Sequence, residues 1–141
     1  MKGKHLQTSF LISIVDDEQS VREAIHSLLK SVGFRAESFT RAEEFLNSDH
    51  LFETSCLILD VRMPGMGGLE LQELLLASHF SLPIVFISAH GDSEAQARAL
   101  EAGAVAFLQK PFSEEALLNA INSSLTANTD RLQDRSPNRP T

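Results

Sequence analysis

Five short apolar runs alternate along the chain with segments of helical periodicity, and no other feature limits the fold as strongly. The runs expected to form strands are 10–15, 35–39, 56–59, 84–87 and 104–108. Three of them are nearly continuous apolar stretches, which is typical of parallel strands covered on both faces. A strand followed by a helix, five times over, predicts an α/β fold with a doubly wound, five-stranded parallel sheet.

The segments between the strands carry apolar residues at helical spacing. Helices are expected over 21–32, 41–48, 69–78, 93–102 and 114–126. Ser20 and Glu23 fit a capping box at the start of the first helix, and Gly33 supplies a left-handed stop after it. Ser113 fits an N-cap of the last helix. The fourth helix has mainly alanine on its apolar side, so we expect it to be the least firmly packed.

The length of 141 residues suits one compact domain. We expect that domain over 10–126, preceded by an N-terminal extension over 1–9. Residues 127–141 lose helical periodicity and gain Asn, Asp, Arg and Pro, which favours a polar linker or a disordered tail. The one cysteine, Cys56, lies in an apolar run and fits a buried thiol in a reducing, cytoplasmic environment.

Charge and hydropathy argue against several classes of protein. The net charge is −7 and the basic residues are scattered, so direct nucleic-acid binding by this domain is not expected. The apolar stretch after Lys2 and Lys4 is short, meets two aspartates and has no small-residue cleavage site, which argues against a signal peptide. No segment approaches the roughly 20 apolar residues of a membrane span, so no membrane association is expected.

Side chains with useful chemistry follow four of the five predicted strands. These residues are Asp16 and Asp17 after the first strand, Asp60 after the third, Ser88 after the fourth and Lys110 after the fifth. Open α/β sheets bind ligands beyond the carboxyl ends of their strands, where the strand order reverses. If the order is 2-1-3-4-5, the three aspartates face one another in that crevice, with the serine and the lysine at one side.

Three neighbouring carboxylates call for a cation, because like charges raise one another's pKa. Oxygen ligands favour a hard divalent ion such as Mg²⁺. The loop after the first strand has neither glycines nor positive charge, which argues against a flavin or dinucleotide. With a metal held by Asp16 and Asp17, Asp60 can attack a phosphoryl group and form an aspartyl phosphate. Lys110 and Ser88 would then contact the phosphoryl oxygens.

Four motifs carry a resemblance to the receiver domains of two-component response regulators. They are "VDDE" after the first strand, "LILDVRMPGMGG" around Asp60, "ISAHGD" at the fourth strand and "GAVAFLQKPF" around Lys110. The resemblance covers about residues 10–125, and the motifs are specific in this order and spacing. It implies a flavodoxin-like (βα)5 fold and a signalling protein rather than an enzyme, with only Mg²⁺-dependent self-phosphorylation and self-dephosphorylation.

The resemblance also implies roles for individual residues. Asp60 would accept a phosphoryl group from a phosphohistidine on a sensor histidine kinase. The ligands implied for Mg²⁺, or for Mn²⁺ as the alternative ion, are Asp16, Asp17, Asp60 and the backbone carbonyl of Arg62. The Arg62 side chain and His90 are implied to tune dephosphorylation by steering or blocking the attacking water.

The resemblance further implies a conformational switch. Phosphorylation would draw Ser88 and Lys110 inward, and the movement of Ser88 would open space for Phe107 to turn inward. This would reshape the face formed by the fourth helix, the fifth strand and the fifth helix. Phe107 stands where a tyrosine is common, so any switch hydrogen bond through that hydroxyl is lacking. A cis peptide bond is implied between Lys110 and Pro111.

The sequence says less about the process that this domain controls than about its acidic site. The last two motifs look most like those of receivers that precede a LuxR-type helix-turn-helix domain, and such a C-terminal domain would bind DNA. A homodimer that forms on phosphorylation through the switch face is a hypothesis. A stand-alone receiver without a DNA-binding domain is the alternative.

Two other functions were weighed against the same residues. A phosphohydrolase with an aspartate nucleophile usually carries a second acidic residue two positions later, but Arg62 stands there. A receiver-like interaction module that works without phosphorylation would have no need of the acidic pair, Asp60 or Lys110.

Overall fold

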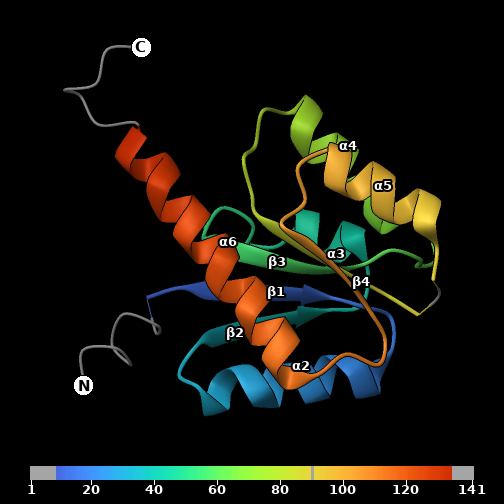
Figure 1. Cartoon of the computed structure of the whole chain (residues 1–141), viewed down its shortest axis with the longest axis horizontal. Coiled ribbons are helices and arrows are strands. Elements are labelled where there is room, and N and C mark those ends of the chain that lie inside the picture. The colour runs from blue at the N-terminus through green and yellow to red at the C-terminus, as the bar shows by residue number, and fades with distance from the viewer. Residues whose placement is uncertain (1–8, 90, 135–141) are drawn as a thin grey trace.

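The computed structural model describes residues 9–89 and 91–134, with side chains as far as Thr126. Strands and helices alternate along this part of the chain (Figure 1). Their order is β1 (Leu11–Val15), α2 (Gln19–Ser31), β2 (Arg35–Phe39), α3 (Ala42–Leu46), β3 (Thr54–Asp60), α4 (Gly68–Ala77), β4 (Ile84–Ser88), α5 (Ser93–Glu101), β5 (Ala106–Gln109) and α6 (Glu114–Asp134). The predicted (βα)5 order is therefore confirmed.

The five strands form one parallel sheet in the order β2-β1-β3-β4-β5. This is the order that the sequence analysis assumed, and it is the flavodoxin-like arrangement. The chain leaves β1 for β2 on one side and returns to β3 on the other, so the strand order reverses between β1 and β3. The carboxyl ends of these two strands therefore border the crevice in which such sheets bind ligands.

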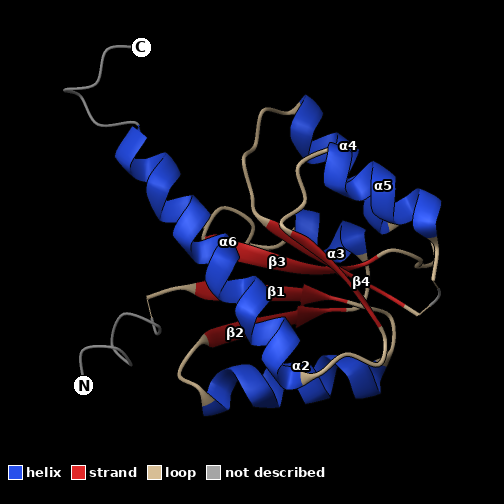
Figure 2. Ribbon diagram, viewed as in Figure 1, coloured by secondary structure: helices blue, strands red, loops and turns tan. Residues whose placement is uncertain are grey.

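Helices cover both faces of the sheet (Figure 2). On one face α2 and α6 pack on the alternate residues of the strands, in a core that includes Ile14, Ile25, Ile58, Leu117 and Ile121. On the other face α3, α4 and α5 pack on a second core that includes Phe45, Leu59, Leu71, Phe86 and Ala99. Burial on both faces explains why the central strands read as continuous apolar runs rather than alternating ones.

The predicted capping box at Ser20 is wrong. The helix begins earlier, at Gln19, with Glu18 at the N-cap position and Ser20 inside the first turn. The Oδ1 atom of Asp16 accepts a hydrogen bond from the Glu18 N–H at 2.8 Å, so this aspartate already satisfies a backbone group at the start of the helix. The predicted stop is confirmed, because Gly33 has a φ of 96°.

The last helix is longer than predicted. Ser113 caps it as expected, because its hydroxyl accepts the Ala116 N–H at 3.0 Å, but the helix continues past Thr126 to Asp134. Residues 127–134 include Ala127, Arg131, Leu132 and Gln133, which are good helix formers, and the first proline after Pro111 comes only at Pro137. The expected end of the helix near residue 126 is thus wrong, whereas the assignment of 127–141 to a linker or tail stays a prediction. Residues 135–141 lie outside the described residues, as do residues 1–8 of the predicted extension over 1–9.

Two further predictions concern the side chains that α5 buries and the lack of a membrane-spanning helix. The buried side chains of α5 are Ala95 and Ala99, so this helix does bury small side chains, as its sequence predicts. Within residues 9–89 and 91–134, no helix combines the length and the apolar character needed to cross a membrane.

Candidate functional site

The polar residues singled out in the sequence gather at the carboxyl ends of the strands. Asp16 follows β1 directly, and Asp60 and Ser88 are the last residues of β3 and β4. Lys110 follows β5 directly, and its backbone N–H donates to the Ser88 carbonyl at 2.7 Å. The parallel sheet brings these four residues together although they are separated along the chain. The predicted gathering of these residues at one edge of the sheet is therefore confirmed, while their roles stay predictions.

Asp16, Asp17 and Asp60 form a compact acidic cluster. Each offers one carboxylate oxygen, and these three oxygens lie within 4.8 Å of one another. Asp16 is fully buried and Asp60 is 5% exposed, whereas Asp17 faces solvent. Three carboxylate oxygens at this spacing match the ligands that Mg²⁺ takes from proteins, with solvent completing its shell.

The Asp16 carboxylate provides a direct test of whether a cation fits. Its Oδ1 atom accepts the Glu18 N–H, but its buried Oδ2 atom accepts no hydrogen bond from any residue that the structure describes. The Lys110 ammonium lies 2.8 Å from this Oδ2 atom, so their contact is an ion pair whose geometry falls outside that of a regular hydrogen bond. This buried oxygen accepts no hydrogen bond and is balanced by positive charge alone, so its position suits a cation and would suit a metal ion.

Lys110 is shared among three carboxylates. Besides Asp16, its Nζ atom lies 3.1 Å from Glu18 Oε1 and 3.8 Å from Asp60 Oδ2, and its side chain is 13% exposed. Burial alone would lower the pKa of Lys110, but the close contact with Asp16 and the charges of Asp60 and Asp16 outweigh burial and raise it. The lysine therefore stays protonated and supplies a fixed positive charge beside Asp60.

Asp60 has an unusual ionisation for an aspartate. Burial raises the pKa of Asp60 to about 7, the charge of Asp16 adds to this rise, and Lys110 opposes it. Asp17 raises this pKa further, while a hydrogen bond from the Arg62 backbone N–H lowers it. Without a metal ion the carboxyl group is thus held between its neutral and ionised forms near neutral pH. A divalent cation would favour the ionised form, which is the nucleophilic one.

Ser88 and Phe107, two of the residues predicted to act as a switch, lie on the neighbouring strands β4 and β5. Ser88 is buried at the end of β4, one strand away from Asp60. Phe107 pairs with Phe86 across β4 and β5, and their ring centroids are 6.2 Å apart. Phe107 is only partly buried. The peptide bond between Lys110 and Pro111 is cis, as the resemblance implies.

Of the two residues predicted to tune dephosphorylation, the structure describes Arg62. The Arg62 guanidinium forms an ion pair with Asp92, and the other carboxylate oxygen of Asp92 accepts the Ala95 N–H at the start of α5. Arg62 therefore links the loop after β3 to α5. His90 lies outside the described residues.

Sequence analysis missed two partners of the site, Glu18 and Asp92. Both follow predicted site residues within four positions, so their place in the sequence was a signal, but nothing in the sequence shows which lysine or arginine they meet. Cys56, by contrast, behaves as predicted. Its thiol is fully buried, and burial raises its pKa to about 12, with a hydrogen bond between Cys56 and Ser124 acting against the rise.

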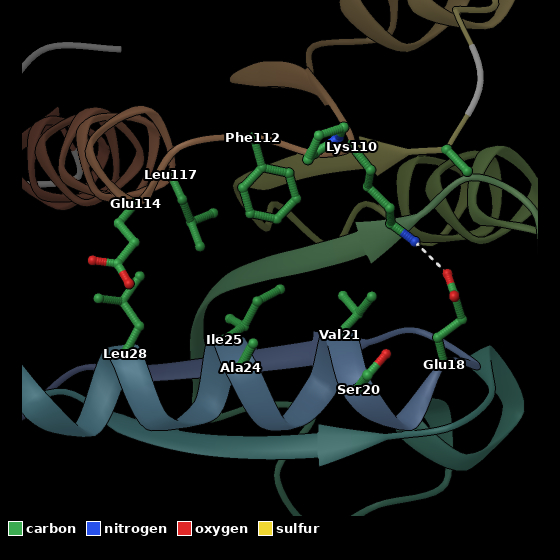
Figure 3. A pocket seen from close by; sticks show the side chains of 12 residues that line it. Glu18, Ser20, Val21, Ala24, Ile25, Leu28, Lys110, Phe112, Glu114 and Leu117 are labelled. Atoms are coloured by element: carbon green, nitrogen blue, oxygen red, sulfur yellow. Dashed lines mark hydrogen bonds and ion pairs between the residues drawn. The ribbon is translucent and has the colours of Figure 1, made fainter.

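A cavity of about 590 Å³ borders the acidic site (Figure 3). It lies between α2 and the segment that connects β5 to α6. Most of its wall is apolar, from Val21, Ile25, Leu28, Phe112 and Leu117. The ion pair of Glu18 with Lys110 stands at one end of it. The charged site and a largely apolar surface are therefore neighbours.

Comparison with known proteins agrees with this site. Residues 12–122 match the family model of the response regulator receiver domain. The response regulator protein TmoT of Ectopseudomonas mendocina is 48% identical over 115 residues, which are 82% of this chain and 52% of that protein. The transcriptional regulatory protein TdiR of Thauera aromatica is 42% identical over 119 residues, which are 84% of this chain and 52% of that protein.

Solved structures show the same likeness. The structure of the response regulator StyR matches with a TM-score of 0.84 and 50% identity, over 90% of this chain and 64% of that one. The structure of FixJ-N matches with a TM-score of 0.75 and 34% identity, over 83% of this chain and 94% of that one. The chain spans about half the length of the curated relatives it matches. It belongs to the family of response regulator receiver domains.

Proposed function

We propose that Asp60 accepts a phosphoryl group from a phosphohistidine on a sensor histidine kinase, in a reaction that depends on Mg²⁺. One observation carries this proposal above all others. The carboxylate oxygens of Asp16, Asp17 and Asp60 lie within 4.8 Å of one another, with the Lys110 ammonium beside them. No such cluster is needed for packing, since ionised groups at the edge of a core repel one another and lose hydration.

The chain's own residues supply the chemistry of the transfer. An Asp60 carboxylate oxygen forms a bond to phosphorus while the phosphorus–nitrogen bond of the phosphohistidine breaks. The electron pair of the broken bond stays on the departing imidazole. Lys110 pairs with one phosphoryl oxygen, and the Ser88 hydroxyl donates to another. Asp16, Asp17, Asp60 and the Arg62 carbonyl would hold the metal, which supplies positive charge that offsets the phosphoryl oxygens. Mn²⁺ suits the same oxygen ligands.

The protein is then a signalling domain and not an enzyme that acts on other molecules. Loss of the phosphoryl group needs only water at the same site. Arg62 and His90 would set how easily that water approaches. The ion pair with Asp92 holds the Arg62 guanidinium at the start of α5.

The output would follow from a change in the face formed by α5, β5 and α6. The contact of Phe107 with Phe86 lies just beneath that face and supports a switch through this pair. We further propose that the face mediates a homodimer that forms on phosphorylation. Because relatives about twice as long carry names such as transcriptional regulatory protein, we propose control of transcription through a DNA-binding domain outside this chain.

The test is incubation with acetyl phosphate, with and without Mg²⁺, followed by mass spectrometry of the intact protein. We expect a mass increase of one phosphoryl group that requires Mg²⁺ and is absent in Asp60→Asn. Steady release of phosphate without a stable adduct would instead indicate a phosphohydrolase. An unchanged mass under all conditions would indicate an interaction module that works without phosphorylation.

A further inference from the structure

Glu18 has no part in the mechanism described so far, yet its side chain points into the site. It occupies the N-cap position of α2 but makes no side-chain capping hydrogen bond. Its carboxylate instead contacts the ammonium of Lys110, which lies 92 residues further along the chain, at 3.1 Å (Figure 3). A carboxylate at a helix N-terminus also interacts favourably with the helix dipole.

The position of Lys110 conflicts with metal binding. Its ammonium lies 2.8 Å from Asp16 Oδ2, which is also the buried oxygen best suited to a cation, and 3.8 Å from Asp60 Oδ2. Two positive charges repel strongly at such distances, more so where water is excluded. A divalent ion can therefore bind Asp16 Oδ2 only if the ammonium moves away from that atom.

We propose that Glu18 is a positioning residue, which retains the Lys110 ammonium beside Asp60 when a divalent cation takes its place on Asp16. This inference rests on the proposed function, because it concerns the same metal and the same acceptor. Glu18 gives the displaced charge a partner within the site, so binding of the cation does not have to expel Lys110 into solvent. The phosphoryl group would then meet a lysine that is already in place.

The surroundings of Lys110 determine whether its ion pair with Glu18 affects cation binding. Ion pairs between fully exposed side chains contribute little, and Glu18 is 56% exposed. Lys110, however, is only 13% exposed, and its ammonium contacts three carboxylates. Loss of one of these partners therefore changes the position that the ammonium prefers. Without Glu18 the ammonium would stay more firmly on Asp16 and compete better with the cation.

The variant Glu18→Gln isolates this role. The backbone N–H that Glu18 donates to Asp16 Oδ1 does not involve the side chain, so the variant leaves that hydrogen bond intact. Glu23→Gln is the matched control. It removes the same charge from the same helix, but its carboxylate contacts Gln19 and not the site. The chain has neither Trp nor Tyr, so calorimetric titration with Mg²⁺ and Mn²⁺ is the suitable measurement of affinity.

We expect Glu18→Gln to weaken binding of both ions about three- to tenfold, and Glu23→Gln to change it less than about twofold. In a Lys110→Met background, Glu18→Gln should lose most of its effect, because the competing ammonium is gone. Phosphorylation by acetyl phosphate gives a second readout that needs no Lys110 variant. The Mg²⁺ concentration for half-maximal rate should rise in Glu18→Gln, and the rate at saturating Mg²⁺ should also fall relative to Glu23→Gln, because Lys110 is no longer held beside Asp60.

Three results would overturn the inference. Equal affinities of Glu18→Gln and Glu23→Gln would show that contact with Lys110 does not matter. An equal loss with and without Lys110 would show a simple effect of net charge. In both cases Asp60 of the wild-type protein would still be phosphorylated, so the proposed function would stand. Absence of cation binding by the wild-type protein would overturn the proposed function together with this inference.

Discussion

Asp60 combines two conditions that oppose each other when no cation is bound. Its place at the end of β3 buries it, and its neighbours Asp16 and Asp17 are also acidic. Both conditions favour the protonated form, whereas a nucleophile must be ionised. Lys110 offsets part of this conflict, and a divalent ion would offset the rest. Activity and stability are thus expected to depend on the metal at the same residue.

The raised pKa of Asp60 predicts a pH-dependent cost to folding in the metal-free protein. In the folded state this pKa is about 7, against an ordinary value of 3.8 in the unfolded chain. The folded state therefore binds the proton more tightly, so stability is lost as pH rises from about 4 to 7. In EDTA, Asp60→Asn should raise the free energy of unfolding relative to wild type, by up to about 4 kcal/mol at pH 8.

Urea denaturation at pH 5 and pH 8, in EDTA and in excess Mg²⁺, measures this difference. The advantage of Asp60→Asn should shrink at pH 5, because nearly all of the folded wild-type protein keeps its proton on Asp60 there. Mg²⁺ should also reduce it at pH 8, since only the wild-type carboxylate attracts the ion strongly. An advantage of the variant that is the same at both pH values would contradict the raised pKa.

The principal site residues could be predicted because each one interrupts an apolar run at the end of a strand. Asp60 and Ser88 stand out in this way, and parallel strands bring such ends to one edge of the sheet. The contact between Glu18 and Lys110 could not be predicted, because the choice among three nearby carboxylates depends on side-chain conformation. The same holds for the ion pair of Arg62 with Asp92.

The start of α4 is fixed to the strand that carries the acceptor. A Cβ atom on Gly68 would lie 2.3 Å from the Asp60 carbonyl oxygen and 3.1 Å from the Phe86 ring. Only glycine allows the first turn of this helix to approach the backbone of β3 so closely. The need for Gly68 arises from packing between elements, so the sequence alone, which predicted a helix only from residue 69, did not indicate it.

Replacement of Gly68 by alanine should therefore push α4 away from Asp60. We expect Gly68→Ala to lower the free energy of unfolding by about 2 kcal/mol or more, as overpacked sites do. Gly91→Ala is the control, because a Cβ atom there would come no closer than 3.4 Å, to the amide end of the Gln109 side chain. It should change stability by less than about 0.5 kcal/mol. Equal denaturation curves for both variants would refute the packing argument.

Helix boundaries show where local patterns stop being sufficient. The "SVRE" pattern is a valid capping signal, but Asp16 provides the hydrogen bond at the start of α2 and the helix begins before Ser20. At the other end of the chain, a polar composition favoured a linker, yet α6 continues to Asp134. In each case a neighbouring residue or an uninterrupted helix outweighed the local preference.

The whole molecule joins the acidic site to a distant face through β4 and β5. Ser88 ends β4, and Phe86 on the same strand contacts Phe107 on β5. The helix on this face, α5, is held by the small side chains of Ala95 and Ala99, while Leu100 is 43% exposed. Shallow packing allows a helix to move at low cost, and an exposed leucine can add to an interface.

This arrangement predicts a change of oligomeric state on phosphorylation. Sedimentation velocity of the protein with Mg²⁺ and acetyl phosphate should show a larger species than the protein with Mg²⁺ alone. Asp60→Asn should sediment alike in both conditions, which controls for an effect of the reagents. Leu100→Glu should suppress the larger species without loss of phosphorylation, because a charge on α5 would oppose contact between two copies of the face. Identical sedimentation of wild type in both conditions would remove the dimer hypothesis.

Phosphorylation is proposed to take place at Asp60 within the acidic cluster, and the position that carries the phosphoryl group can be measured directly. Borohydride reduces an aspartyl phosphate to homoserine, which tandem mass spectrometry can assign to one position in a peptide. After treatment with acetyl phosphate and Mg²⁺, we expect homoserine at position 60, and none there when EDTA replaces Mg²⁺. Homoserine at another aspartate, or its absence in the presence of Mg²⁺, would contradict the account.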